Sequence, residues 1–252
     1  MTIAVTHIGT ATILLEIGSL RILTDPVFDP PGRKYGFGWG TSSTHTETPA
    51  MTVEQVGRVD LVLLSHDHHA DNFDDAGRAM LPRVPTVITT KPGAKRLGHP
   101  GARGLSDFEE TRVGELKITA TPARHGPPGS LPIAGHVIGF MLEHPLLEGP
   151  LYISGDTVWF GGIEEVAKRF RPTISFLHLG SVRFPISGPF RYTFDAREGV
   201  TAANALGSKT IIPIHYEGWT HFRQPTSETF ALLDKELGAR VKRLKRGVRT
   251  EL

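Results

Sequence analysis

The chain has 252 residues, 39% of them apolar and 21% charged, which is typical of a globular protein with a sizeable core. Its formal net charge of +2 excludes the strongly basic surface that nucleic acid or anionic lipid would require. The absence of cysteine excludes disulfides, thiolate metal ligands and cysteine nucleophiles, and it fits a reducing compartment. With no signal peptide at MTIAVTHIGTATILLEIG and no apolar run of the ~20 residues that a membrane span needs, we expect a cytoplasmic protein.

Short apolar and β-branched runs dominate the first quarter of the chain. They predict strands over residues 3–8, 12–17, 20–24 and 60–65, with turns at residues 9–10 and 18–19. Residues 29–48 are rich in glycine, proline and aromatic side chains. Because this segment is too long for a simple connector, we predict that it is either functional or disordered.

The rest of the chain combines further strands with amphipathic helices. The predicted strands cover residues 86–89, 115–121, 136–143, 151–154, 174–179 and 210–214, and the predicted helices cover residues 72–81, 162–170, 195–206 and 227–237. Asp195 and Glu198 have the spacing of a capping box, and the basic end VKRLKRGVR is interpreted as a solvated strand or tail. Two blocks of strands, each followed by helices, predict one α/β domain over residues 1–252 with two packed sheets and outer helices.

Side chains that bind metals follow four of the predicted strands directly. His66 and His68 follow strand 60–65 in SHDHHADNFD, and residues two apart on an extended chain point the same way. His125, Asp156 and His215 follow later strands in TPARHG, SGDT and PIHYEG. Without thiolates, a divalent metal must be held by imidazole nitrogens and carboxylate oxygens. Such side chains at four strand ends predict a metal site.

These motifs, together with the opening HIGTATILLEIGSLRILTDPVF, resemble the metallo-β-lactamase superfamily in their order and intervals over residues 3–220. The branch that the chain most resembles contains the L-ascorbate-6-phosphate lactonase and N-acyl phosphatidylethanolamine phospholipase D types. The resemblance implies a four-layer αββα sandwich. It also implies one metal on His66, His68 and His125, with Asp156 bridging to a second metal that His215 also binds.

The family pattern His-x-His-x-Asp-His is altered in this chain. Ala70 stands where the pattern has Asp, and Asp71 stands where it has the second His. Asp71, Asp156 and His215 would still bind a second ion with water, and an oxygen-rich donor set favours a harder metal. His69 is a further candidate donor for this second site. We therefore expect one or two divalent ions, zinc first, with manganese, iron or nickel as alternatives.

The chemistry that the resemblance implies is hydrolysis of a small ester, lactone or phosphodiester by a metal-bound hydroxide. Asp71 and Asp156 are the predicted catalytic residues, because either could orient the hydroxide or accept its proton. Aromatic side chains with scattered arginines, Arg33 and Arg191 among them, suit a small anionic substrate. The predicted pocket residues are His178, Trp159, His45, Trp219 and His221.

Three other functions compete with this hypothesis. Ala70 favours a non-catalytic, metal-stabilised binding protein, which would bind a metal without hydrolysing esters or phosphodiesters. A diiron oxidoreductase would need a filled two-iron site and usually a flavin domain. A nuclease would need a basic face, which the charge balance opposes. We expect no nucleic-acid partner, whereas a homo-oligomer is compatible with the resemblance.

Overall fold

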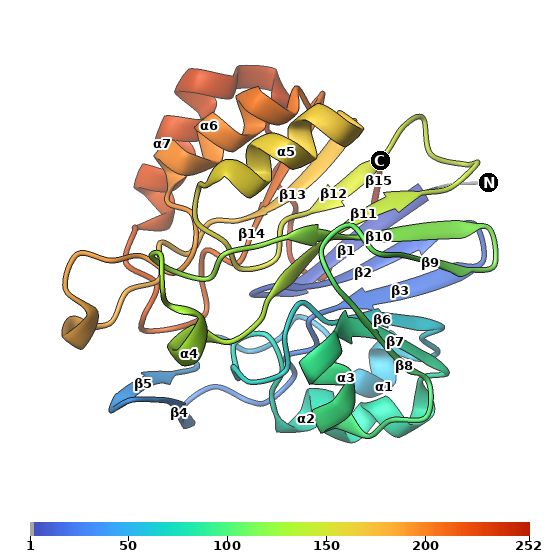
Figure 1. The fold of residues 1–252 in the computed structure, drawn as a ribbon, viewed down its shortest axis with the longest axis horizontal. Helices are drawn as coiled ribbons and strands as arrows, with labels where there is room; N and C mark the ends of the chain where they lie inside the picture. The colour runs from blue at the N-terminus through green and yellow to red at the C-terminus, as the bar shows by residue number, and fades with distance from the viewer. Residues whose placement is uncertain (1–2) are drawn as a thin grey trace. The chain divides into compact units, whose positions relative to one another are not determined.

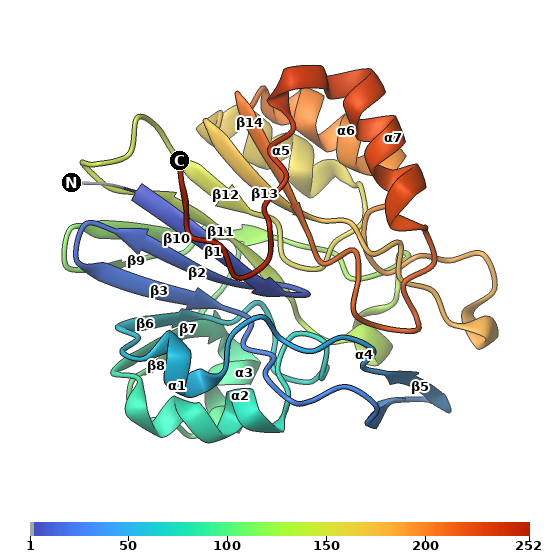
Figure 2. The same ribbon diagram turned by 180° about the vertical axis from the view of Figure 1, so that it is seen from behind.

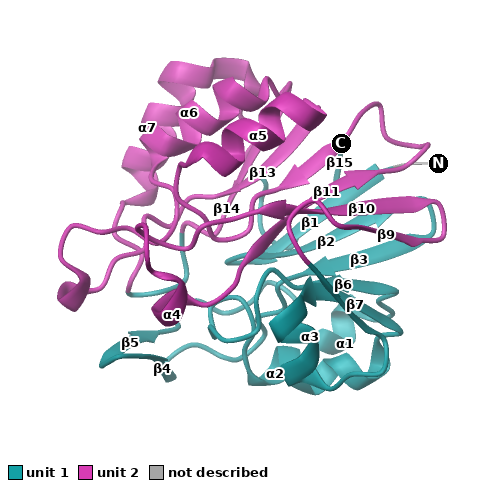
Figure 3. Cartoon of the chain, viewed as in Figure 1, with its two compact units in different colours: residues 1–105, 217–220, 244–252 teal, residues 106–216, 221–243 magenta. Residues whose placement is uncertain are grey.

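A computed structural model describes residues 3–252, which divide into two compact units (Figure 3). Unit 1 extends to Leu105 and includes Glu217–Thr220 and Leu244–Leu252. Unit 2 comprises Ser106–Tyr216 and His221–Arg243. Among the described residues, no helix is long and apolar enough to cross a membrane.

Unit 1 is built on a seven-stranded sheet with the order β15-β1-β2-β3-β6-β7-β8 (Figure 1). The predicted N-terminal meander is confirmed as antiparallel, and β3, β6, β7 and β8 run parallel to one another. The strands are β1 (Ile3–Gly9), β2 (Thr12–Ile17), β3 (Leu20–Thr24), β6 (Leu61–Leu63), β7 (Thr86–Thr90), β8 (Ala102–Leu105) and β15 (Thr250–Glu251). Parallel strands need crossover connections, and here these contain α1 (Val53–Val56), α2 (Asp75–Met80), η1 (Leu81–Arg83) and α3 (Lys91–Leu97).

Helix α2 begins at Asp75, three residues later than the sequence predicts. Residues 69–73 form a turn instead, because the backbone N–H groups of Asn72 and Phe73 both donate to the His69 carbonyl. Asp74 then caps the helix by accepting a hydrogen bond from the Gly77 N–H over 2.7 Å. The late start leaves the segment after β6 in an irregular conformation.

The core of unit 1 joins its sheet to the helices on one side of it (Figure 2). Apolar side chains of the strands meet those of the crossover segments. The cluster consists of Ile8, Leu14, Leu23, Val56, Val59, Val62, Leu64, Phe73, Met80, Leu81, Val84 and Val87. Burial of these side chains fixes the end of β6, from which the SHDHHADNFD motif departs.

We expect a buried histidine in β1 to contribute to the pH dependence of stability. The side chain of His7 is 1% exposed, and its Nε2 lies 3.1 Å from the Thr10 carbonyl oxygen. Burial lowers the pKa of His7 from 6.5 to about 4, and the charge of Arg246 acts in the same direction. Protonation of His7 is therefore disfavoured in the folded state, so the His7 contribution to stability is complete above pH 6.5 and falls as the pH is lowered towards 4.

We expect His7→Gln to remove this part of the acid sensitivity, because a glutamine amide can still donate to the Thr10 carbonyl without becoming charged. Between pH 7 and pH 4.5 the wild type should lose roughly 2–3 kcal/mol more unfolding free energy than the variant. Urea unfolding at the two pH values measures the difference. Equal losses in the two proteins would show that His7 does not control the acid sensitivity.

Residues 29–48 contain a β-hairpin, so this segment is neither disordered nor a simple connector. Its strands are β4 (Lys34–Gly38) and β5 (Thr41–Thr44), which pair antiparallel. At the tip, Trp39 and Gly40 both have positive φ values, 51° and 74°, as a tight hairpin turn requires. At the base, the Tyr35 hydroxyl donates to Asp29 over 2.5 Å.

Unit 2 contains a six-stranded sheet with the order β14-β13-β12-β11-β10-β9. Strands β9 to β12 are antiparallel, and β12, β13 and β14 are parallel. The strands are β9 (Glu110–Val113), β10 (Leu116–Pro122), β11 (Ile138–Glu143), β12 (Leu151–Ile153), β13 (Ile174–His178) and β14 (Thr210–Ile214). The helices are α4 (Leu131–Ala134), α5 (Gly161–Phe170), η2 (Pro185–Ser187), α6 (Ala196–Leu206), α7 (Thr226–Leu237) and η3 (Gly238–Arg240).

Helices α5, α6 and α7 lie together on one face of this sheet (Figures 1 and 2). Asp195 is confirmed as the cap of α6, where it accepts a hydrogen bond from the Glu198 N–H over 2.9 Å. The shared core consists of Met141, Tyr152, Ile163, Val166, Ala167, Leu177, Leu179, Phe194, Ala202, Ala203, Leu206, Ile211, Tyr216, Phe230, Leu233 and Leu237. This packing holds the C-terminal ends of β12, β13 and β14 side by side.

Candidate metal centre

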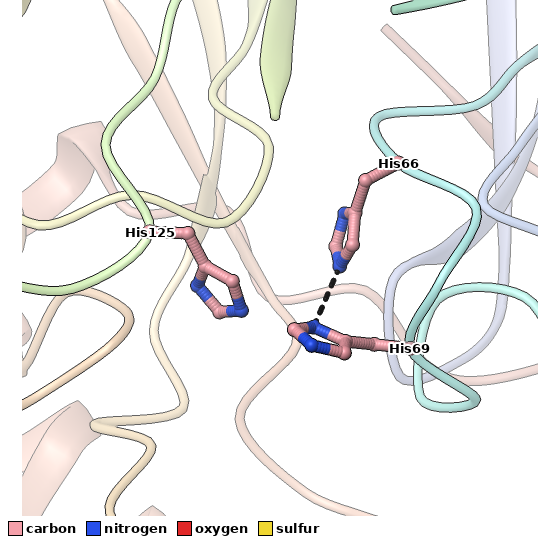
Figure 4. A group of neighbouring side chains, drawn as sticks. All are labelled: His66, His69 and His125. Carbon is pink, nitrogen blue, oxygen red and sulfur yellow. Dashed lines mark hydrogen bonds between the residues drawn. The ribbon is translucent and has the colours of Figure 1, made fainter. Parts of the chain in front are cut away.

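In unit 1, the loop after β6 carries the histidines of the SHDHHADNFD motif. Asp25 holds the start of this loop, since its Oδ1 accepts the Ser65 N–H over 2.7 Å. Ser65 Oγ lies 2.9 Å from His66 Nδ1, and the other ring nitrogen of His66, Nε2, is directed at the imidazole of His69. That atom lies 3.1 Å from His69 Nδ1 (Figure 4). Asp71, only 2% exposed, adds a buried carboxylate to the same loop.

The third residue of the motif, Asp67, anchors the loop to α3. Arg96 donates to both of its carboxylate oxygens, over 2.8 and 2.5 Å, and Arg78 donates to its backbone carbonyl. Burial tends to raise the pKa of Asp67, but the hydrogen bonds and charges of Arg96 and His68 together outweigh it and hold this pKa well below the ordinary range. The sequence does not predict this clamp, because KPGAKRL lacks helical apolar periodicity and α3 is not expected there.

Loss of the clamp should destabilise unit 1. We expect Arg96→Ala to lower the unfolding free energy at pH 7 by roughly 1–3 kcal/mol, because it leaves the buried Asp67 carboxylate without its guanidinium. Lys95→Ala, at the adjacent exposed position of α3, is the matched control and should change it by less than about 0.5 kcal/mol. Urea unfolding of the three proteins tests the difference. Equal effects of the two substitutions would argue against an anchoring role.

Aromatic side chains pack beside the histidine loop of unit 1. The rings of His45 and Trp219 stack with centroids 4.9 Å apart, and both side chains are buried. Phe37 of the hairpin lies 6.0 Å from Trp219 and 5.4 Å from His69. The structure thus brings the predicted pocket residues His45 and Trp219 together. Phe37 was not predicted, since one aromatic in a glycine-rich hairpin gives no sequence signal.

In unit 2, Asp156 lies between two histidines. Its Oδ2 is 3.9 Å from His125 Nε2, and its Oδ1 is 3.5 Å from His215 Nδ1. Asp156 and His215 are fully buried, and His125 is 6% exposed. His215 has φ 55°, a left-handed conformation that costs free energy in a non-glycine residue and is common at functional sites. Three strand-end donors predicted from the sequence therefore do meet.

The hydrogen bonding of His125 is compatible with a cation in this group. Its Nδ1 lies 2.7 Å from the Tyr192 carbonyl oxygen, which can only accept, so Nδ1 carries the proton. In the neutral ring, the lone pair of Nε2 then faces the carboxylate of Asp156. Two electron-rich groups that face each other in a buried site are stabilised by a positive ion between them. An imidazole and carboxylate donor set is one that zinc and manganese accept.

Comparisons with known proteins place the chain in a family. Residues 20–216 match the family model described as the beta-lactamase superfamily domain. The chain belongs to this superfamily. A UPF0173 metal-dependent hydrolase from Methanoregula boonei is 31% identical over 221 residues, which cover 85% of this chain and 82% of that protein. The chain is therefore a metal-dependent hydrolase of the superfamily.

Solved structures of similar proteins confirm the expected α/β metallo-β-lactamase fold. The isothiocyanate hydrolase from Delia radicum gut bacteria has a TM-score of 0.82 at 24% identity, covering 99% of this chain and 98% of that one. A possible metal-dependent hydrolase from Veillonella parvula has a TM-score of 0.86 at 20% identity, covering 100% of both chains. At these identities the likeness concerns the fold alone.

Two of the predicted pocket residues, His178 and His221, lie near His215 in unit 2. The ring of His178 is 5.4 Å from that of His215, and its Nδ1 lies 3.0 Å from Ser154 Oγ. His221 lies 4.8 Å from Phe222, whose ring is 4.6 Å from His215. Both histidines are buried; His178 packs directly against the His215 ring, and His221 packs against Phe222.

The remaining candidates have structural partners. Trp159 packs against the helical core of unit 2, and its carbonyl accepts a hydrogen bond from Arg124. The two arginines that suggested an anionic substrate are engaged in ion pairs. Arg33 lies 2.6 Å from Asp75, and Arg191 lies 3.1 Å from Glu198. These ion pairs reduce the positive charge that the two arginines offer to a substrate.

Proposed function

We propose that the donors of the two units act together, as one domain, in a metal-dependent hydrolase of small ester, lactone or phosphodiester substrates. The observation that carries this proposal is the buried Asp156 carboxylate, whose two oxygens face two different imidazoles. One ion would take His66, His125 and a third imidazole of the SHDHHADNFD motif. The other would take Asp71, Asp156 and His215. Zinc suits these donors best, and manganese, iron and nickel are the alternatives.

A bound divalent ion supplies an activated water and polarises the scissile carbonyl or phosphoryl group. Asp71 and Asp156 orient the attacking water and take up its proton, since both are buried carboxylates beside imidazoles. The hydrogen bond from His125 Nδ1 to the Tyr192 carbonyl fixes the imidazole ring and so positions its Nε2. No covalent enzyme intermediate is needed, because the attacking group is water.

The substrate that we propose is a small molecule rather than a polymer. The motif resemblance to the lactonase and phospholipase D branch supports lactones and phosphodiesters, and the aromatic group Phe37, His45 and Trp219 offers a surface for an organic ring or chain. The balanced charge of the chain supports neither a nucleic-acid nor a membrane-surface partner. We also keep the cytoplasm as the proposed location and a homo-oligomer as a proposed assembly.

A substrate panel tests this proposal. The protein is loaded with zinc or manganese and assayed on a p-nitrophenyl ester, a sugar lactone, bis-p-nitrophenyl phosphate and an isothiocyanate, each beside an anionic analogue. We expect metal-dependent turnover of at least one ester, lactone or phosphodiester. A lower KM for the anionic analogues would support the anionic substrate. Tight metal binding without turnover of any compound would instead favour the non-catalytic, metal-stabilised binding protein.

A further inference from the structure

The histidine loop of unit 1 departs from the family pattern, and its structure shows where the departure lies. We propose that the loop contains one extra residue after His66, so that His69, and not His68, is the second histidine donor. Asp71 then supplies the acid of the pattern. This inference rests on the proposed metal centre, and it assigns donor roles within that centre to residues of this chain.

The first observation is the separation of the ring nitrogens. Two nitrogens bound to one zinc ion, each ~2.0–2.1 Å from it in a tetrahedron, lie about 3.3 Å apart. His66 Nε2 and His69 Nδ1 lie 3.1 Å apart (Figure 4). Ser65 already occupies the other ring nitrogen of His66, so these two nitrogens are the pair that could share an ion.

The second observation is the path of the backbone. Strand β6 ends at Leu63, before the first histidine, and the chain bends at residues 65, 67 and 68, so it is not extended through the motif. The alternation that would direct His66 and His68 towards one ion therefore does not apply. Instead the N–H groups of Asn72 and Phe73 donate to the His69 carbonyl, over 3.2 and 2.9 Å, and this turn carries Asp71.

The third observation is what surrounds each ring. His69 is buried and packs against Phe37, whereas His68 is half-buried. His68 Nδ1 lies 3.7 Å from the Asp67 carboxylate, which Arg96 also contacts. The His68 ring is thus associated with the Asp67 clamp, and the His69 ring lies in the buried aromatic group.

One extra residue after His66 shifts the alignment of the family pattern by one position. Ala70 then no longer falls at a ligand position. His69, Ala70 and Asp71 now fit the His-x-Asp part of the pattern, so Ala70 falls at a position where any residue is allowed. Asn72 stands where the pattern has its second histidine. It is fully buried, and its Nδ2 donates to Ser65 Oγ over 3.4 Å. The second ion would then lack one imidazole but keep its carboxylate.

Metal affinities of neighbouring variants test the assignment. His66→Ala, His68→Ala and His69→Ala are stripped of metal and titrated with zinc against a chromophoric chelator, and cobalt spectra report the coordination. We expect His66→Ala and His69→Ala to lose at least about 100-fold in affinity and to change the cobalt spectrum, because each removes a direct ligand. His68→Ala should stay within about threefold of the wild type. Thermal melts of the metal-free proteins report folding.

A loss in His68→Ala equal to or larger than that in His69→Ala would overturn the inference while leaving the proposed function intact. A wild type that binds neither ion would overturn both. Should His69→Ala fail to fold, cadmium-loaded wild type with isotope-labelled histidine decides the matter, since metal–nitrogen coupling appears only at ligating rings. Coupling at His69 supports the inference, and coupling at His68 in its place overturns it.

Discussion

Asp156→Asn is expected to lower kcat/KM by at least about 1000-fold, which corresponds to roughly 4 kcal/mol of lost transition-state stabilisation. Asparagine keeps the shape of the side chain but offers one oxygen where the carboxylate offers two. Asparagine therefore has only one oxygen to place between His125 and His215. It should hold a metal ion less tightly, so the metal content of the purified variant should also fall. Steady-state kinetics on the best substrate of the panel and elemental analysis measure the two effects.

The stability of the metal-free variant separates a catalytic role of Asp156 from a structural one. Removing a buried charge from the metal-free protein should leave its melting temperature unchanged or raise it. Asp195→Asn is the matched control in unit 2, because asparagine caps helix α6 as well as aspartate does. It should retain activity and metal. An Asp156→Asn variant with wild-type turnover would remove Asp156 from the site.

Removal of the metal is the second change with a large expected effect. Dialysis against a chelator should abolish hydrolysis and lower the melting temperature by roughly 5–10 °C, because an ion at about 100 times its Kd stabilises the native state by ~2.7 kcal/mol. Zinc or manganese added back should restore both properties, and the ion that restores more activity identifies the better cofactor. A chelated protein that keeps its activity and melting temperature would contradict the account.

The sequence predicted best the parts of the molecule where an apolar strand ends in a polar donor. In unit 2, β10, β12 and β14 are short buried runs, and His125, Asp156 and His215 follow them closely. Pairing through β11 and β13 joins these strands into one sheet and brings the three side chains together. The burial and periodicity of these strands can be inferred from their residue types, so this half of the site could be predicted.

The loop of unit 1 could not be predicted as well, because its shape depends on backbone groups and distant side chains. The turn at His69 is made by N–H groups that any residue carries, and the clamp on Asp67 comes from a helix without apolar periodicity. Likewise, no pattern in the sequence indicates the hydrogen bond from His125 to the Tyr192 carbonyl. The spacing of two residues between His66 and His68 therefore gives no indication of the turn that follows it.

The number of metal ions per chain tests the account most directly. Elemental analysis of zinc-loaded wild type should give close to two ions, and Asp71→Ala should give close to one, because Asp71 is the unit 1 carboxylate assigned to the second ion. Asp75→Ala, four residues along and 61% exposed at its side chain, should keep two. A wild type that holds no more metal than Asp71→Ala would contradict the two-ion centre proposed here.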